Sequence, residues 1–178
     1  MACYCNQTIK GLCKDCESSK GGIIEVLIAN YSDVTPTISA GTITDITVAQ
    51  GASFYKYEFR KGTGSMTSTL NVDAANGVNY VSTELVLQFT KMETRKRIEM
   101  AALAVNELAV IVKDANGKYW YLGVNEAVTA SAGSGQTGQA VGDGNYYSIT
   151  LTDNSDSFPY EVLASVVTGL AADCPCNE

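Results

Sequence analysis

The sequence predicts a mainly β protein, a β-sandwich or β-barrel with one flanking α-helix. Short runs of apolar, β-branched and aromatic residues recur along the chain between Gly, Asn and Asp turn formers. A single segment with helical periodicity lies between two blocks of such runs. Both ends of the 178-residue chain are polar and aperiodic. We therefore expect a β-sandwich domain at 22–167, a Cys-rich N-terminal arm at 1–21 and a Cys-containing C-terminal arm at 168–178.

The first block of predicted strands opens with a nearly continuous apolar run at 23–31. Residues 32–41 are rich in turn formers and are predicted to be a linker. Two strand-like runs follow at 42–49 and 52–60, separated by the dipeptide Gln50-Gly51. This spacing predicts that the two runs pair as a tight hairpin.

The block continues with a weakly alternating run at 66–72, a turn at 73–77 and a long strand at 79–90. Residues 92–105 then predict the helix, because they are good helix formers. Its expected buried face consists of apolar residues at three- and four-residue spacing, namely Ile98, Ala101, Ala102 and Val105.

The second block begins with the clearest hairpin signal, in which runs at 107–114 and 118–124 flank an Ala-Asn-Gly turn. A glycine-rich segment at 130–144 predicts a mobile or interface loop that orders on assembly. Strands are predicted at 145–153 and 159–167.

Composition argues against enzymatic function. The chain contains no histidine, which removes the usual general base and the commonest metal ligand. The glycines Gly133, Gly135 and Gly138 match the spacing of a dinucleotide-binding loop, but no helix or βαβ pattern surrounds them. We therefore expect no enzyme activity and no required cofactor.

The first residues lack the apolar core of a signal peptide, and no apolar run is long enough to span a membrane. These features predict a protein made in the cytoplasm with no membrane partner. The net charge of −7 is unevenly distributed. Residues 1–118 hold 12 basic and 12 acidic residues, whereas 119–178 hold seven acids and no base. Such an acidic segment repels nucleic acid and attracts basic surfaces, or simply keeps a surface soluble.

The six cysteines all lie in the predicted arms, as Cys3-x-Cys5, Cys13-x-x-Cys16 and Cys174-x-Cys176. Two cysteine pairs complete a tetrahedral zinc site, so Cys13 and Cys16 are candidate ligands together with Cys174 and Cys176, or alternatively with Cys3 and Cys5. Disulfides within or between subunits, and free thiols, are the other interpretations.

Three consecutive basic residues, Arg95, Lys96 and Arg97, lie in the first half of the predicted helix. The helix dipole does not favour cations at that end. We regard them as candidates for a subunit interface, with an ordinary solvated face as the alternative.

Several segments in a fixed order resemble the tail tube (major tail) proteins of long-tailed bacteriophages, particularly those of Bacteroidetes phages. The resemblance covers approximately residues 52–167. Its carriers are KGTGSMTSTLNV, then ELVLQFTKMETRKRIEMAALAVNELAVIVKDANGKYWYLG, then GDGNYYSITLTD and PYEV. The Cys-rich arms do not belong to the family pattern.

The resemblance implies a structural virion protein. Tail tube subunits form hexameric rings that stack head to tail, with strands joining an inner barrel through which DNA passes during ejection. The implied partners are further copies of the chain and other phage tail proteins, and DNA would pass without specific binding. A net-negative lumen would suit this role, because phosphates must slide and not adhere. Rival interpretations are a tail terminator or head–tail connector, or a small Cys-rich metal-binding module.

If the cysteine arms join adjacent subunits, replacing Cys13 and Cys16 by Ser should lower the resistance of assembled tubes to heat or to a chelator. Thermal melts with and without chelator measure this. Unchanged tubes would count against a role for the two cysteines in assembly.

Overall fold

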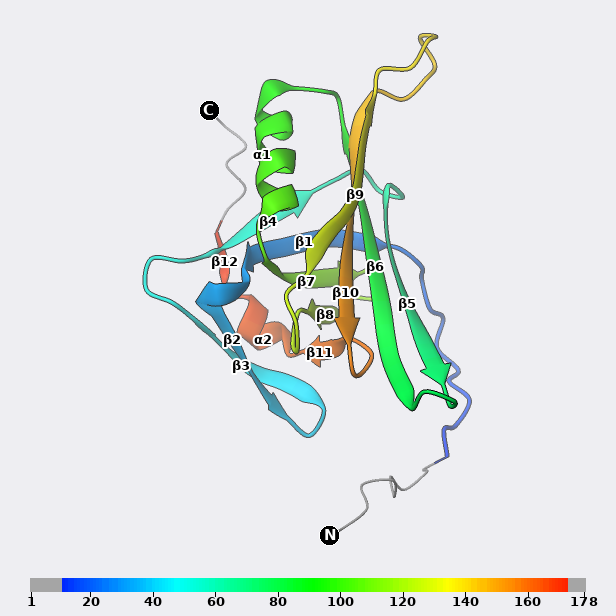
Figure 1. Cartoon of the computed structure of the whole chain (residues 1–178), viewed down its shortest axis with the longest axis vertical. Helices are drawn as coiled ribbons and strands as arrows, with labels where there is room; N and C mark the ends of the chain where they lie inside the picture. Colours follow the sequence, from blue (N-terminus) through cyan, green and yellow to red (C-terminus); the bar gives the residue numbers. More distant parts are fainter. Residues whose placement is uncertain (1–10, 173–178) are drawn as a thin grey trace.

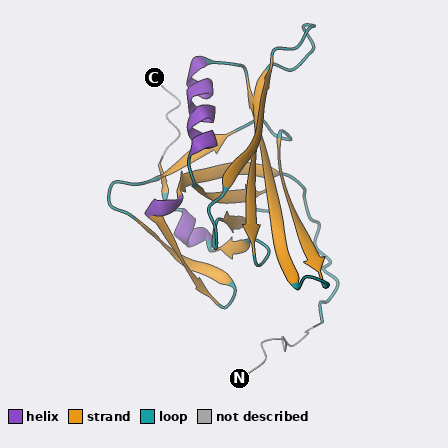
Figure 2. Cartoon of the chain, viewed as in Figure 1, coloured by secondary structure: helices purple, strands orange, loops and turns teal. Residues whose placement is uncertain are grey.

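The computed structural model describes residues 11–172 as two β-sheets with one long helix, which confirms the mainly β sandwich with a flanking helix (Figures 1 and 2). The larger sheet, sheet A, has eight strands in the order β12-β4-β1-β7-β8-β11-β3-β2. Their bounds are β1 Ile23–Asn30, β2 Val34–Ser39, β3 Thr42–Val48, β4 Phe54–Glu58, β7 Leu108–Asp114, β8 Tyr119–Leu122, β11 Tyr160–Val162 and β12 Ala171–Ala172.

The smaller sheet, sheet B, has four antiparallel strands in the order β5-β6-β10-β9. They are β5 Gly64–Asp73, β6 Val78–Thr90, β9 Thr129–Gln136 and β10 Tyr146–Ser155. Helix α1, Thr94–Val105, follows β6 and packs beside β9 and β10. Two short helices, η1 at Tyr31–Asp33 and α2 at Ala164–Val167, connect strands of sheet A.

Strands β1 and β7 are the centre of the molecule because both of their faces are buried. One face packs on sheet B and α1, where Val26 and Val110 contact a cluster that includes Leu85 and Leu151. The other face packs inside the curled sheet A, where Ile111 joins the cluster that contains Ile43, Ile46, Phe54 and Val167. Strands covered on both faces need apolar side chains at successive positions, which explains the nearly continuous apolar runs.

The prediction of a linker at 32–41 is wrong. Val34–Ser39 forms β2 and pairs with β3 through the two-residue turn Ala40-Gly41, whose φ angles are 51° and 81°. Two positive φ angles are what a tight hairpin requires. The turn was missed because alanine rarely adopts this conformation.

The predicted hairpin between 42–49 and 52–60 is also wrong, although both runs are strands. Strand β3 pairs with β2 and β11, whereas β4 pairs with β1 and β12 on the far side of sheet A. The turn after β3 redirects the chain instead of reversing it, so Ile43 and Phe54 meet inside the same core cluster.

The second predicted hairpin is confirmed, since β7 and β8 pair as expected. Part of the predicted glycine-rich loop forms the edge strand β9 instead. The last predicted strand is a short strand, β11, followed by the single turn of α2. Within the range predicted as the C-terminal arm, β12 pairs with β4.

The helix lies where the sequence predicts it, but it buries a different face. Leu103 is its one fully buried residue, and Met100 packs against the core beside it. Ile98 is 57% exposed and Val105 is 82% exposed, although both were expected to face inward. The prediction failed because the helix has a second apolar stripe, which includes Met100 and Leu103, and this stripe is the one that faces the core.

Replacing Ile111 by Ala should lower the free energy of unfolding by about 2–5 kcal/mol, because the cavity would open in a fully buried core. The same substitution at Ile38 is the matched control, since that side chain is 41% exposed on edge strand β2. Urea denaturation of both variants measures the difference. Equal losses would contradict the assignment of β7 to the centre of the core.

Candidate assembly surface

The outward face of sheet B is a broad surface of small polar side chains. Because side chains alternate along a strand, the residues between the buried ones point away from the core. On the three strands β5, β6 and β10 they form cross-strand rows rich in hydroxyl groups. The outward hydroxyl and amide residues are Ser65, Thr67, Thr69, Asn71, Tyr80, Ser82, Gln88, Thr90, Tyr146, Ser148, Thr150, Thr152 and Asn154, and the apolar Val78 and Val86 lie among them.

This face carries few charged residues, and all of them are acidic. The four strands of sheet B contain no lysine or arginine. Their acids are Asp73, Glu84 and Asp153, of which Glu84 and Asp73 alternate with the buried residues and so lie on the outward face. The face therefore offers many neutral hydrogen-bonding groups and no attractive site for phosphate.

Both edges of sheet B are open within residues 11–172, because β5 pairs only with β6 and β9 pairs only with β10. An unpaired strand edge presents free amide and carbonyl groups that can pair with another chain. Monomeric proteins commonly protect such edges with charged residues or proline. Neither edge strand has this protection, since β5 is uncharged from Gly64 to Val72 and β9 is uncharged throughout.

The edges of sheet A are different. Edge strand β2 carries Pro36 and a register shift between Thr37 and Ile38, and the other edge strand, β12, has two residues. Proline, irregular pairing and short length each make an edge a poor template for further pairing. The contrast identifies sheet B as the part of the described chain that is open to strand addition.

The glycine-rich segment owes part of its composition to packing. A Cβ atom built on Gly135 would lie 2.9 Å from the ring of Tyr147, so any larger residue here would require that ring to move. Gly138 has φ 73° at the start of the loop that follows β9. The carboxylate of Asp143 accepts hydrogen bonds from the backbone amides of Gln139 and Ala140 across this loop, which lowers the pKa of Asp143.

The three basic residues of α1 have different environments. The ammonium group of Lys96 donates to the carbonyl of Thr90 and lies 3.7 Å from the carboxylate of Glu93, so it fastens the helix to the end of β6. Arg95 and Arg97 are exposed. The interface role predicted for Arg95, Lys96 and Arg97 stays a prediction, with Lys96 also serving its own chain.

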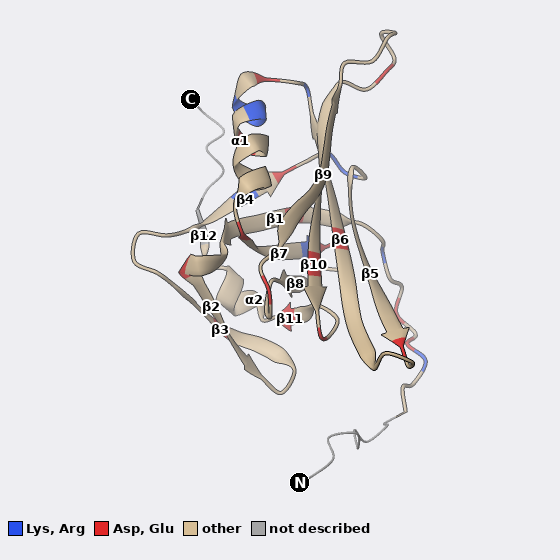
Figure 3. Ribbon diagram, viewed as in Figure 1, with Lys and Arg blue, Asp and Glu red and all other residues tan. Residues whose placement is uncertain are grey.

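The acids of the final third do not form one surface (Figure 3). Asp143 lies in the loop after β9, Glu161 forms an ion pair with Lys118, and Asp156 accepts a hydrogen bond from Asn125. Asp173 and Glu178 lie outside the described residues. The uneven charge of the sequence therefore becomes several separate acidic positions in the fold.

Cys13 and Cys16 are exposed and unbridged in the N-terminal segment. This segment meets the body of the domain at Asn116, whose side chain accepts from the amide of Lys20 and donates to the Lys20 carbonyl. Cys3, Cys5, Cys174 and Cys176 lie outside the described residues. Among residues 11–172, no three Cys, Asp or Glu side chains gather closely enough to hold a metal ion. Zinc binding by the arms stays a prediction.

Asp153 is the one buried acid of the described chain, although the sequence predicts a turn that begins at this residue. It lies on the inward face of β10 and is 3% exposed. One carboxylate oxygen, Oδ1, has no hydrogen-bond partner in the structure. Burial raises the pKa of Asp153 to about 6; the amide of Gly123 opposes this shift and the charge of Glu126 adds to it. The alternation of β10 was a usable signal, because Ile149, Leu151 and Asp153 share its inward face.

Comparisons with protein-family models, with curated proteins and with solved structures each give no match. The resemblance to tail tube proteins therefore stays a prediction. None of the helices among residues 11–172 is long and apolar enough to cross a membrane.

Replacing Asp153 by Asn should stabilise the protein at pH 7 by up to about 3 kcal/mol. A carboxyl with a pKa of about 6 when folded and near 3.8 when unfolded binds its proton more tightly in the folded state. Its contribution to stability is therefore present below pH 4 and is lost as the pH rises toward 6 and above, at about 1.4 kcal/mol per pKa unit.

Denaturant unfolding of both proteins between pH 4 and pH 8 measures this. The stability difference between variant and wild type should grow from pH 4 to about pH 6 and then level off. A difference that does not vary with pH would show that Asp153 titrates normally.

Proposed function

We propose that this chain is a structural virion protein, a tail tube subunit of a long-tailed bacteriophage. Copies would assemble through sheet B into rings that are hexameric by family resemblance, stack head to tail and form the conduit for genome ejection. The observation that carries the proposal is sheet B itself, an antiparallel sheet with two unprotected edges and a hydroxyl-rich outward face.

Strand direction supports closure into a ring. Sheet B has an even number of antiparallel strands, so its two edge strands, β5 and β9, run in opposite directions. Consider a second copy related to the first by rotation about a ring axis that runs roughly parallel to the strands. Its β5 would lie antiparallel beside β9 of the first copy. The antiparallel sheet then continues from copy to copy and ends only when the ring closes, which removes every edge.

The surface chemistry supports a conduit. In such a ring the core and α1 lie outside, and the hydroxyl-rich face of sheet B lines the lumen. The four strands supply no basic residue, and their outward acids are Asp73 and Glu84. This lining is net negative and would let DNA pass without holding its phosphates.

Negative-stain electron microscopy of the purified protein tests the proposal. Long tubes are expected. Isolated rings would favour a tail terminator or head–tail connector, and monomers at every concentration would overturn self-assembly.

A charge on an edge strand sharpens the test. Thr67→Lys places a cation on exposed edge strand β5, and the matched Thr47→Lys places one on exposed β3 inside sheet A. The first variant should need roughly tenfold more protein to assemble, which corresponds to about 1.4 kcal/mol lost at each contact. The second variant should assemble like the wild type, and equal behaviour of the two would argue against sheet B as the contact.

A further inference from the structure

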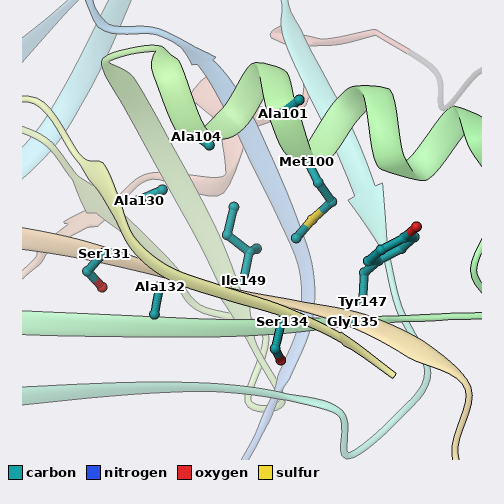
Figure 4. Close-up of a pocket in the computed structure, with 11 residues that line it drawn as sticks. Met100, Ala101, Ala104, Ala130, Ser131, Ala132, Ser134, Gly135, Tyr147 and Ile149 are labelled. Atoms are coloured by element: carbon teal, nitrogen blue, oxygen red, sulfur yellow. The ribbon is translucent and has the colours of Figure 1, made fainter. Parts of the chain in front are cut away.

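A groove runs along the free edge of sheet B, between α1 and β9. Its volume is about 470 Å³. Small side chains line most of it, including Ala101 and Ala104 from the helix and Ala130 from the strand, with Met100 and Ile149 at its floor (Figure 4). Ala130 lies on the helix side of β9, whereas Ala132 and Ser134 point to the other side. A chain that pairs with β9 must therefore cover this groove.

The opposite edge of the sheet carries the complementary feature. On the inward face of β5, Leu70 is 50% exposed and Val72 is 65% exposed, because the β5–β6 hairpin extends beyond the core that covers Met66 (Figure 1). Apolar side-chain surface that stays exposed to water is costly. Among residues 11–172, one edge of the sheet thus has unfilled space beside small side chains, and the other has large side chains that are only partly covered.

We propose that the groove between α1 and β9 receives Leu70 on β5 of a second copy of this chain. This inference rests on the proposed function, since it specifies how neighbouring copies meet. An alternative pairing of β9 with β9 of another copy is a poorer fit, because β9 offers only Ala, Gly, Ser, Thr and Gln side chains. That pairing would leave the groove empty and Leu70 in water.

The geometry of a closed barrel sets the register. Within one chain, pairing across the sheet places Met66, Leu85, Leu151 and Ala130 on one row. Barrel strands are spaced by about 4.8 Å and tilt by about 35–45°, so four strands displace the next copy along the strand by roughly four to five residues. Only an even displacement keeps inward side chains inward. A displacement of four brings Leu70 to the row of Ala130.

The direction of this displacement follows from burial. A displacement in the opposite sense would bring Gly62 to the row of Ala130, but β5 begins only at Gly64. Much of β9 would then have no strand beside it, and Leu70 would stay exposed. Displacement toward Leu70 pairs the strands along most of their length and covers the apolar residues.

Charge complementarity agrees with the same register. Arg60 and Lys61 precede β5, are exposed and form no ion pair with any residue among 11–172. Asp143 lies in the loop that follows β9. In the antiparallel contact the start of β5 lies beside the end of β9, so the two cations of one copy face the carboxylate of the next. The hydrogen bonds from Gln139 and Ala140 lower the pKa of Asp143, so this carboxylate carries its charge at neutral pH as an ordinary aspartate does.

Cysteine cross-linking tests the contact. Residues directly opposite each other on neighbouring strands have the Cβ separation that a disulfide needs. We expect the double variant L70C/A130C, assembled and then oxidised, to give a ladder of covalent multimers on a non-reducing gel. The control L70C/A132C should give no ladder, since Ala132 is on the other face of β9. The single variants and the wild type, oxidised in the same way, show how much cross-linking comes from the native cysteines.

A second cysteine pair, S68C/G133C, provides a further test in case the first double variant does not assemble. Ser68 is two residues from Leu70, and Gly133 is three residues from Ala130 because β9 has a bulge between Ala130 and Ala132, so both residues still lie on the inward face. A Cβ at Gly133 meets only ordinary contacts. Tubes or rings by microscopy without a ladder from either pair would overturn this inference and leave the proposed function standing. Failure of the wild type to form rings or tubes would overturn the proposed function itself.

Discussion

The requirement that strands β1 and β7 be covered on both faces determines the rest of this structure. Their side chains are buried on alternate sides, so no single layer can shield them. Sheet B and α1 cover one side, and the curled ends of sheet A cover the other. In this arrangement sheet A curls over its own core. Sheet B packs one face against β1 and β7 and leaves its other face exposed.

The open face and edges of sheet B follow from that arrangement. Its inward rows supply Leu85, Leu87 and Leu151 to the core, and its outward rows are rich in hydroxyl groups and have few charges. Asp153 interrupts the inward rows with a buried carboxyl whose pKa is raised by burial. It lies opposite Thr83, which is also buried and forms a hydrogen bond with Ser68, so a short polar row runs across strands β5, β6 and β10 on the inward face of sheet B.

The sequence predicted those elements whose signal is local. The strand of β1, the hairpin of β7 and β8 and the position of α1 were all visible, because periodicity and turn residues act within a few positions. Pairing partners were less accessible. Nothing local distinguishes a turn that reverses the chain after Val48 from one that carries it across the core to Phe54.

The candidate site was predicted only in part for the same reason. The sequence singled out the cations of α1 and the cysteines, because charge and cysteine spacing can be read directly. It did not predict that glycine-rich Thr129–Gln136 would be an edge strand, since glycine disfavours strands in isolation and is tolerated here by contact with β10. The groove beside β9 is formed between this strand and α1, which lie about 30 residues apart in the sequence. No short sequence motif could therefore have predicted it.

The exposed face of α1 carries apolar residues that the sequence predicts to be buried, and the proposed assembly bears on this difference. Ile98, Ala101 and Val105 share an apolar stripe, which is why the sequence predicts that they are buried. Within a single chain that stripe is exposed, and Ala101 also lines the groove beside β9. Exposed apolar patches of this kind are typical of surfaces that bind a partner, which agrees with the proposed contact between copies. Since Ala101 belongs to both the stripe and the groove, a neighbour seated in the groove, as proposed, would reach this side of the helix at Ala101.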